Sequence, residues 1–217
     1  MNSFFVTATG TDIGKTFCTA GLLRAHPGLR AIKPLLSGYE PDQDSDSSQL
    51  LAAMGEDVNA ANIAAITPWR YKAPLSPDMA AQREGHVIDY TALLEFCRAA
   101  MATAPNGLLI EGAGGAGVPL TATKLTADWI KDLGLPVLLV SGTYLGSISH
   151  CVTTAEFLLN RNIPIHAILL NESVCAPVPS LETKAALARY LPCPIRPIQR
   201  HAGIETFRDI LHCKERS

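Results

Sequence analysis

The stretch Gly14-Lys15-Thr16 carries residue types that can bind phosphate. It follows a short apolar run, Ser3–Thr7, and a turn rich in glycine and threonine, and it opens a segment with helical spacing that extends to about Ala25. Free backbone N–H groups at a helix start attract phosphate oxygens, the lysine can reach the terminal phosphates, and the threonine hydroxyl can bind Mg²⁺. The alternative is a lysine in the first turn of an ordinary helix, but such a lysine opposes the helix dipole. We therefore predict a nucleotide site.

The spacing of this turn differs from the common phosphate-binding loop. The pattern G-x-x-x-x-G-K-[ST] requires glycine at position 9, where this chain has Thr9, and its glycine stands one place later, at Gly10. The motif alone leaves open whether the loop has an altered geometry or the match is accidental.

Carboxylates are the expected partners of the threonine, because Mg²⁺ prefers oxygen ligands. Glu111 ends an apolar run and is followed by GAGGAG, so it should lie at the end of a strand beside backbone that a ligand can approach. A surface charge is the alternative for this residue. Asp42, Asp44 and Asp46 are candidates for a second acid, and each taken alone is also compatible with a solvated loop.

Lys33 is a second basic candidate. It stands within the apolar stretch Leu29–Leu36, next to Pro34. A buried lysine is costly unless its charge is used, so it should meet a ligand or an acid. The alternative is a surface lysine whose stem covers apolar groups.

These residues fall between alternating strand-like and helix-like segments. Continuous apolar runs without alternation predict strands covered on both faces, as in a parallel sheet. We expect an α/β fold of P-loop NTPase type with a doubly wound, mostly parallel sheet flanked by helices, and a single domain over residues 1–217. Asp46 should cap a helix through about Met54. The other expected elements are a strand that begins at about Leu29 and ends near Pro34, strands at 107–111, 136–142 and 165–171, and helices at 89–101, 126–133, 147–160 and 181–191.

Composition narrows the class of partners. With a net charge of −2 and 47% hydrophobic residues, the chain has no basic surplus for nucleic acid or anionic lipid and enough apolar residues for a sizeable core. We find no apolar stretch long enough for a membrane helix. The six scattered cysteines suit reduced thiols in a cytoplasmic protein.

Six motifs, in this order and spacing, resemble dethiobiotin synthetases. The likeness runs from about Phe5 to Asn171. In that family the phosphate loop is one residue longer than the common one, and its first glycine aligns with Ala8. The motifs are GTDIGKT, IKPLLSG, DSDSSQL, APLSPDMAAQREG, IEGAGGAGVPL and GTYLGSISH.

The resemblance implies a reaction of 7,8-diaminononanoate, CO2 and ATP that gives dethiobiotin, ADP and phosphate. One amine takes up CO2 as a carbamate, whose oxygen attacks the γ-phosphorus to give a carbamic–phosphoric anhydride. The neighbouring amine then closes the ring and expels phosphate. The cofactors implied are ATP and Mg²⁺, and the substrates are small molecules.

The resemblance also implies roles for particular residues. Lys15 would serve the phosphates and Lys33 the carbamate and transferring phosphoryl group, with Thr11 and Ser37 beside them. Thr16, Asp46 and Glu111 match the Mg²⁺ site. The remaining nucleotide-binding positions implied are Asp12, Ile13, Gly14, Phe17, Gly112, Ala113, Gly114, Asn171 at the adenine, and Pro197, Ile198 and Gln199 over the base.

A helix start would complete the site from a second subunit. Gly146 and Ser147 precede a helix whose free N–H groups can hold a carboxylate. By resemblance, this start and Ser149 bind the substrate carboxylate of the partner subunit, which implies a homodimer. An ordinary capped helix is the alternative. Ser149 replaces a common asparagine, and Asp12 stands where glutamate is frequent.

Two other functions remain open from the residues. A P-loop small-molecule kinase would use the same loop but give a stable phosphorylated product without CO2. An ATPase switch of the partitioning type has a similar fold but generally carries a further lysine early in the loop. This chain has no lysine between Ser3 and Ile13.

Overall fold

The computed structural model describes residues 3–41 and 44–212 of the chain. Its main feature is a six-stranded sheet with the strand order β2-β5-β1-β6-β7-β8, in which all neighbouring strands are parallel. This confirms the doubly wound α/β fold. The strands are β1 (Phe4–Ala8), β2 (Arg30–Ile32), β5 (Leu108–Glu111), β6 (Val137–Ser141), β7 (Ile165–Asn171) and β8 (Ile195–Ile198).

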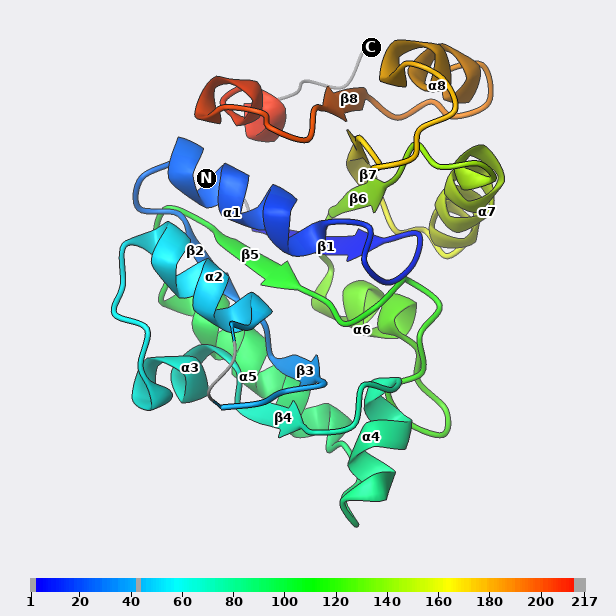
Figure 1. Ribbon diagram of the computed structural model, residues 1–217. Coiled ribbons are helices and arrows are strands. Elements are labelled where there is room, and N and C mark those ends of the chain that lie inside the picture. Colours follow the sequence, from blue (N-terminus) through cyan, green and yellow to red (C-terminus); the bar gives the residue numbers. More distant parts are fainter. Residues whose placement is uncertain (1–2, 42–43, 213–217) are drawn as a thin grey trace.

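Helices cover both faces of this sheet, as Figure 1 shows. Successive side chains of a strand point to opposite faces. Phe5 accordingly packs edge-on against Trp129 on one face, with ring centroids 4.8 Å apart, while Phe4 meets His166. Every residue of β1 is buried, which explains its continuous apolar run. The helices are α1 (Lys15–Ala25), α5 (Tyr90–Ala102), α6 (Thr126–Leu133), α7 (Ser147–Leu159) and α8 (Ser180–Leu187).

The strand predicted within Leu29–Leu36 ends before Pro34, as expected, since β2 covers Arg30–Ile32. Pro34 cannot donate to a ladder, and the chain leaves the main sheet there. β3 (Leu35–Ser37) then pairs in parallel with β4 (Trp69–Tyr71) to make a separate two-stranded sheet. Around it lie α2 (Asp46–Met54), α3 (Ala60–Ile66) and α4 (Pro77–Arg83).

The C-terminal part contains elements that the sequence pattern did not predict. β8 has the sequence IRPI, and its proline is tolerated because β8 is an edge strand paired only with β7. Two 3₁₀ turns follow, η1 (Ile204–Phe207) and η2 (Ile210–His212). Figure 1 shows these turns beside α1.

In the described ranges, no helix is long and apolar enough to cross a membrane. The cysteines described there are free thiols, namely Cys18, Cys97, Cys151, Cys175 and Cys193. Cys213 lies outside the described residues.

Candidate active site

The phosphate loop joins β1 to α1. Two of its residues adopt left-handed backbone angles, Asp12 with φ 57° and Gly14 with φ 94°. A side chain at Gly14 would be excluded, because its Cβ would lie 2.2 Å from the Asn171 side-chain nitrogen. Lys15 is the first residue of the helix, so the amides of the first turn face the loop without intrahelical partners. The turn therefore has the form of an anion site at a helix start.

Ala8 occupies the position where the resemblance implies a glycine. It is fully buried as the last residue of β1, and among the described non-glycine residues only Asp12 and Asn162 have positive φ. Its carbonyl accepts a hydrogen bond from the amide of Ala116 at 3.2 Å. A small residue with negative φ suffices here, and the loop geometry does not require a glycine.

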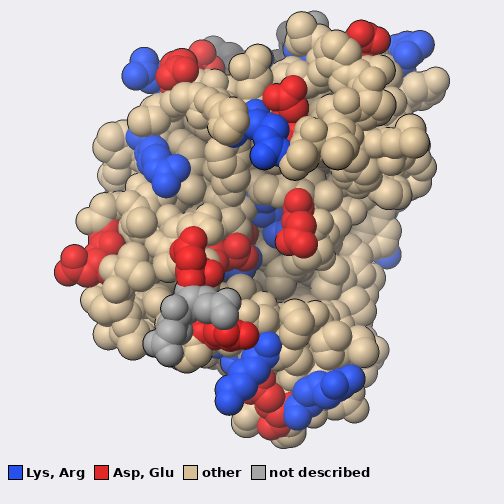
Figure 2. Space-filling model, viewed as in Figure 1, with Lys and Arg blue, Asp and Glu red and all other residues tan. Residues whose placement is uncertain are grey.

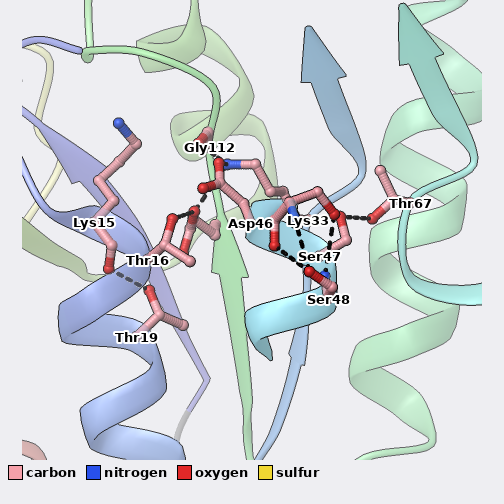
Figure 3. Close-up of polar contacts among 11 residues, drawn as sticks. Lys15, Thr16, Thr19, Lys33, Asp46, Ser47, Ser48, Thr67 and Gly112 are labelled. Carbon is pink, nitrogen blue, oxygen red and sulfur yellow. Dashed lines mark hydrogen bonds and ion pairs between the residues drawn. The ribbon is translucent and has the colours of Figure 1, made fainter. Parts of the chain in front are cut away.

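Lys33, Glu111 and Asp46 form a charged cluster beside the loop (Figure 3). Lys33 Nζ lies 2.8 Å from Glu111 Oε1 and 2.9 Å from Asp46 Oδ2, and it reaches the Gly112 carbonyl at 3.4 Å. Thr16 Oγ1 donates to the same Glu111 oxygen at 2.8 Å. Glu111 is fully buried, Lys33 is 2% exposed, and the Asp46 side chain is 38% exposed. Lys33 thus connects β5 to α2, and Glu111 connects both to the start of α1 through Thr16.

Electrostatics keep Lys33 and Asp46 ionised. Burial alone would lower the pKa of Lys33, but the charges and hydrogen bonds of Glu111 and Asp46 outweigh burial and raise it. Burial likewise acts to raise the pKa of Asp46, yet Lys33 together with the Thr16 hydroxyl lowers it. Lys33 is therefore a fixed positive charge and not a base at neutral pH.

Lys15 has a different environment. It is 7% exposed, and no hydrogen bond or ion pair of its amine occurs among the residues described. Figure 3 shows this amine pointing away from the Lys33 cluster. Burial, followed by repulsion from Lys33, lowers the pKa of Lys15. A buried cation without a partner favours an anion in the adjoining space.

The second acid is Asp46. Asp44 is turned elsewhere, since it accepts hydrogen bonds from Ser48 Oγ at 2.5 Å and Gln49 Nε2 at 3.1 Å. Asp42 lies outside the described residues. The expectation that Asp46 caps its helix is wrong: Ser45 is the N-cap and exchanges hydrogen bonds with Ser48. Because Ser45 caps α2, the Asp46 carboxylate is free to meet Lys33.

A pocket of about 840 Å³ opens beside these groups. On this face of the molecule, Figure 2 shows acidic and basic side chains gathered around a hollow near its centre. The Ser37 hydroxyl faces this region as a buried atom that has no hydrogen-bond partner among the described residues. Predicted residues that line the pocket are Thr11, Asp12, Gly14, Lys15, Thr16, Lys33, Ser37, Asp46, Ala113 and Gly114.

Part of the pocket wall was missed in the sequence. The segment before α4, Pro74–Pro77, lines the pocket together with Leu36, Gly38 and Val118. The motif APLSPDMAAQREG contains this segment, but its residue types alone predict no chemical role for it. Pro74–Pro77, Leu36 and Gly38 lie with β3, β4 and α4, whereas Val118 lies beside Gly114 in the loop after β5.

Asn171 ends β7 next to the loop. Its side-chain nitrogen donates to the Ile13 carbonyl at 2.9 Å, and its Oδ1 is buried without a partner in the described part of the chain. Ile198 pairs with Asn171 in the sheet, so the predicted segment Pro197–Gln199 begins beside it. Phe17 does not line the pocket and instead packs edge-on against Phe207, with ring centroids 6.2 Å apart.

The start of α7 does not line the same pocket. Gly146 has φ 98°, and the space where its Cβ would stand is empty to 4 Å. Ser147 is 2% exposed and its amide donates to the Tyr144 carbonyl at 3.0 Å, while Ser149 is exposed. One chain therefore does not bring these three residues to the Lys33 cluster.

The oxygen groups around Thr16 suit Mg²⁺. Thr16 Oγ1, Asp46 and Glu111 supply a hydroxyl and two carboxylates, which is the hard-ligand set this ion prefers. Glu111 Oε2 is buried and, among the described residues, has no hydrogen-bond partner. An orphaned carboxylate oxygen of this kind fits a cation or its bound water.

A parallel sheet, a loop ending in Gly14-Lys15-Thr16 and an acid at the end of a neighbouring strand define a P-loop nucleotide-binding protein. The family model described as "AAA domain" matches residues 2–207. Among solved structures, the MinC:MinD cell division complex of Aquifex aeolicus resembles the fold with a TM-score of 0.56 at 13% identity, covering 97% of this chain and 86% of that one. A ParA family ATPase from Chlorobium tepidum gives a TM-score of 0.51 at 14% identity, over 97% and 89%. These two likenesses concern the fold alone.

Curated relatives define the family within this class. The ATP-dependent dethiobiotin synthetase BioD of Acidiphilium cryptum is 46% identical over 198 residues, which cover 88% of this chain and 89% of that protein. The protein of the same name from Methylobacterium nodulans is 42% identical over 214 residues, or 94% and 95%. The chain belongs to the family of ATP-dependent dethiobiotin synthetases.

Proposed function

We propose that the protein joins 7,8-diaminononanoate and CO2 at the expense of ATP to give dethiobiotin, as the names of its relatives suggest. One observation carries this function beyond a general phosphate site: the charged Lys33 lines the pocket within reach of both Glu111 and Asp46, while the Lys15 amine has no partner among the described residues. One lysine held by two carboxylates and one lysine with a free amine suit two anionic groups, a carbamate and a triphosphate.

The reaction requires three changes of bonds. An amine of the substrate adds to CO2 and loses a proton, giving a carbamate. A carbamate oxygen then attacks the γ-phosphorus and displaces ADP. The second amine attacks the carbamate carbon, and phosphate leaves as the ring closes, with loss of a proton from that amine.

The protein residues supply position and charge for these changes. Lys15 and the amides of the first turn of α1 would hold the phosphates. Lys33 stays protonated, so it would stabilise negative charge on the carbamate and on the transferring phosphoryl group. Thr11 and Ser37, which line the pocket, would donate hydroxyl hydrogen bonds to these anions. We assign neither lysine the role of a general base.

Mg²⁺ held by Thr16, Asp46 and Glu111 would neutralise charge on the triphosphate. Among the neighbouring positions, the backbone of Gly112, Ala113 and Gly114 runs beside the loop. Gly115, the next residue, is packed so closely that a Cβ there would lie 3.1 Å from the Ala8 carbonyl oxygen. This close approach leaves backbone, and not side chains, facing the phosphates.

We also propose that the active unit is a homodimer. The amide of Ser147 is engaged by Tyr144, so the substrate carboxylate would be held by the amides that follow it in the first turn of α7. These groups do not line the pocket of their own chain, and a second chain would present them. The diamine end would then react at Lys33 while its carboxylate is held by the partner.

A product assay with labelled bicarbonate, diaminononanoate, ATP and Mg²⁺ tests the function. We expect label in dethiobiotin, with one ADP and one phosphate released for each product. A phosphorylated diamine formed without bicarbonate would indicate a kinase. ATP hydrolysis with neither product would indicate an ATPase switch.

A further inference from the structure

The C-terminal turns are packed tightly onto the helix that carries the phosphate loop. The Phe207 ring lies directly over Gly21 of α1, and a Cβ at that glycine would stand 2.4–2.7 Å from three ring atoms. Phe207 is 2% exposed, and it also meets the ring of Phe17. Figure 1 shows η1 and η2 beside α1. A side chain at position 21 would prevent this contact.

Two histidines hold the backbone of the same segment. The Nε2–H group of His26, which follows α1, donates to the Phe207 carbonyl at 3.2 Å. The Nε2–H group of His166 in β7 donates to the Ile210 carbonyl at 2.9 Å. Ile210 is 1% exposed. The segment after Gly203 is therefore attached to both α1 and the main sheet.

Only a short turn separates this attachment from the predicted base site. Ile198 ends β8 beside Asn171, and its carbonyl accepts from the Glu172 amide at 2.9 Å. The turn Gln199–Gly203 then runs to η1, with the Ala202 amide bonded to the Gln199 carbonyl at 3.0 Å. Gln199, Arg200 and His201 are exposed. One end of the turn is fixed by β8 and the other by Phe207.

The phosphate loop also has contacts with neighbouring strands and loops that do not involve Phe207. The amide of Thr9 donates to the Val140 carbonyl at 3.0 Å, and Ala116 bonds to Ala8. Loosening the Phe207 contact should thus free the turn at the base and leave the phosphate contacts in place.

We propose that Phe207 is a positioning residue for the nucleotide base, acting by holding the Gln199–Gly203 turn against the end of β8. This inference rests on the proposed ATP-dependent function. A preorganised turn lowers the entropy cost of ordering the site on binding. Loss of this order should weaken the binding of ligands that have a base and leave the binding of ligands without a base unchanged.

The test compares binding of ATP and of inorganic triphosphate, both with Mg²⁺, by titration calorimetry. Phe207→Leu removes the ring, and Gly21→Ala displaces it without altering Phe207. Phe96→Leu is the matched control, because Phe96 of α5 makes an edge contact with Trp69, with centroids 5.7 Å apart, in another part of the fold. We expect both variants to raise the Kd for ATP about ten-fold and the Kd for triphosphate less than two-fold. In Phe96→Leu both Kd values should be unchanged.

Unchanged ATP binding in Phe207→Leu and Gly21→Ala would overturn the inference. A parallel loss of triphosphate binding would also overturn it, since Phe207 would then act on the phosphate loop or on the whole fold. If the unmodified protein binds ATP but forms no dethiobiotin, the proposed function fails while this inference stands. Gly21→Ala keeps Phe207 and all other side chains. It therefore still tests the inference if Phe207→Leu does not fold.

Discussion

Lys33 and Glu111 continue the register of two neighbouring strands. Ile32 pairs with Ile110 in β2 and β5, and the residues that follow each of them form the 2.8 Å ion pair. Parallel strands end at the same edge of a sheet, which is where ligands bind in folds of this kind. A strand-end lysine and a strand-end acid therefore meet beside the phosphate loop.

Glu111→Gln should separate a metal role from a structural one. Glutamine keeps the shape but loses the charge next to Thr16 and Lys33. We expect kcat to fall about 100-fold, a higher Mg²⁺ concentration for half-maximal rate, and a loss of about 2–3 kcal/mol of stability. Steady-state rates across a Mg²⁺ series and thermal melts measure these effects. The exposed Glu182→Gln is the control, and an unaltered Mg²⁺ requirement would leave Glu111 with a structural role only.

Lys15→Met should abolish turnover and yet stabilise the nucleotide-free protein. The lysine is a buried cation whose amine has no partner among the described residues, so replacing it removes a desolvation cost. We expect a gain of about 1 kcal/mol, or a Tm rise of about 2–4 °C. The exposed Lys131→Met should leave Tm unchanged. A lower Tm for Lys15→Met would contradict the electrostatic account of this site.

The same lysine predicts a pH dependence with a definite sign. Its pKa is lowered in the folded protein, so the unfolded chain binds more protons between the lowered pKa and the ordinary value of 10.5. Stability linked to Lys15 therefore rises with pH through that window. We expect the Tm advantage of Lys15→Met to shrink as pH approaches 10.5. Melts of both proteins from pH 7 upward would show it, and a constant difference would disprove it.

Asn171 should select nucleotides whose base donates a hydrogen bond. The Ile13 carbonyl can only accept, so it holds the amide nitrogen and leaves Oδ1 as an acceptor. ATP offers an amine at the base, whereas inosine triphosphate offers a carbonyl. We expect KM for inosine triphosphate to exceed that for ATP about ten-fold or more, and Asn171→Ala to abolish the difference. Equal KM values in the unmodified enzyme would refute this role.

A shared site predicts complementation between two inactive variants. Lys33→Ala removes the cluster lysine. Ser149→Glu places a negative charge in the first turn of α7 and is preferable to a change at Ser147, which is buried. Like charges repel, so the second variant should not hold the substrate carboxylate. After random subunit exchange, half of the dimers are mixed and each has one intact site, so activity should return to about a quarter of normal.

Exchange must be verified in that experiment by tagging one variant and capturing the other with it. Ser149→Ala is the control for a change at the helix start without added charge. If captured mixed dimers are inactive, each chain builds its own substrate site and the proposed dimer role is incorrect.

Much of the site followed from local patterns. Lys15, Thr16, Lys33 and Glu111 could be predicted because each stands where an apolar strand meets a turn or helix. The choice between Asp44 and Asp46 could not, because both are acids near one helix start. Ser45 is the N-cap of α2 through its hydrogen bonds with Ser48, which leaves the Asp46 carboxylate free to meet Lys33.

The strands that the sequence pattern does not predict, β3, β4 and β8, are explained in similar physical terms. β3 and β4 have three residues each, too few for a periodic signal, and their pairing brings together residues far apart in the chain. β8 contains an arginine and a proline, which argue against a central strand but are compatible with an edge. Tertiary contacts determine the secondary structure of such segments.

The break at Pro34 divides the pocket between two sheets that share no ladder. The phosphate loop and Glu111 depend on the six-stranded sheet, whereas Ser37 and the Pro74–Pro77 wall depend on the two-stranded one. Mutations in the smaller sheet could therefore accumulate, or the sheet could be exchanged between homologues, with little disturbance of the nucleotide end. In a directed-evolution experiment, new acceptor molecules should arise first from changes in β3, β4 and the segment before α4, with ATP use retained.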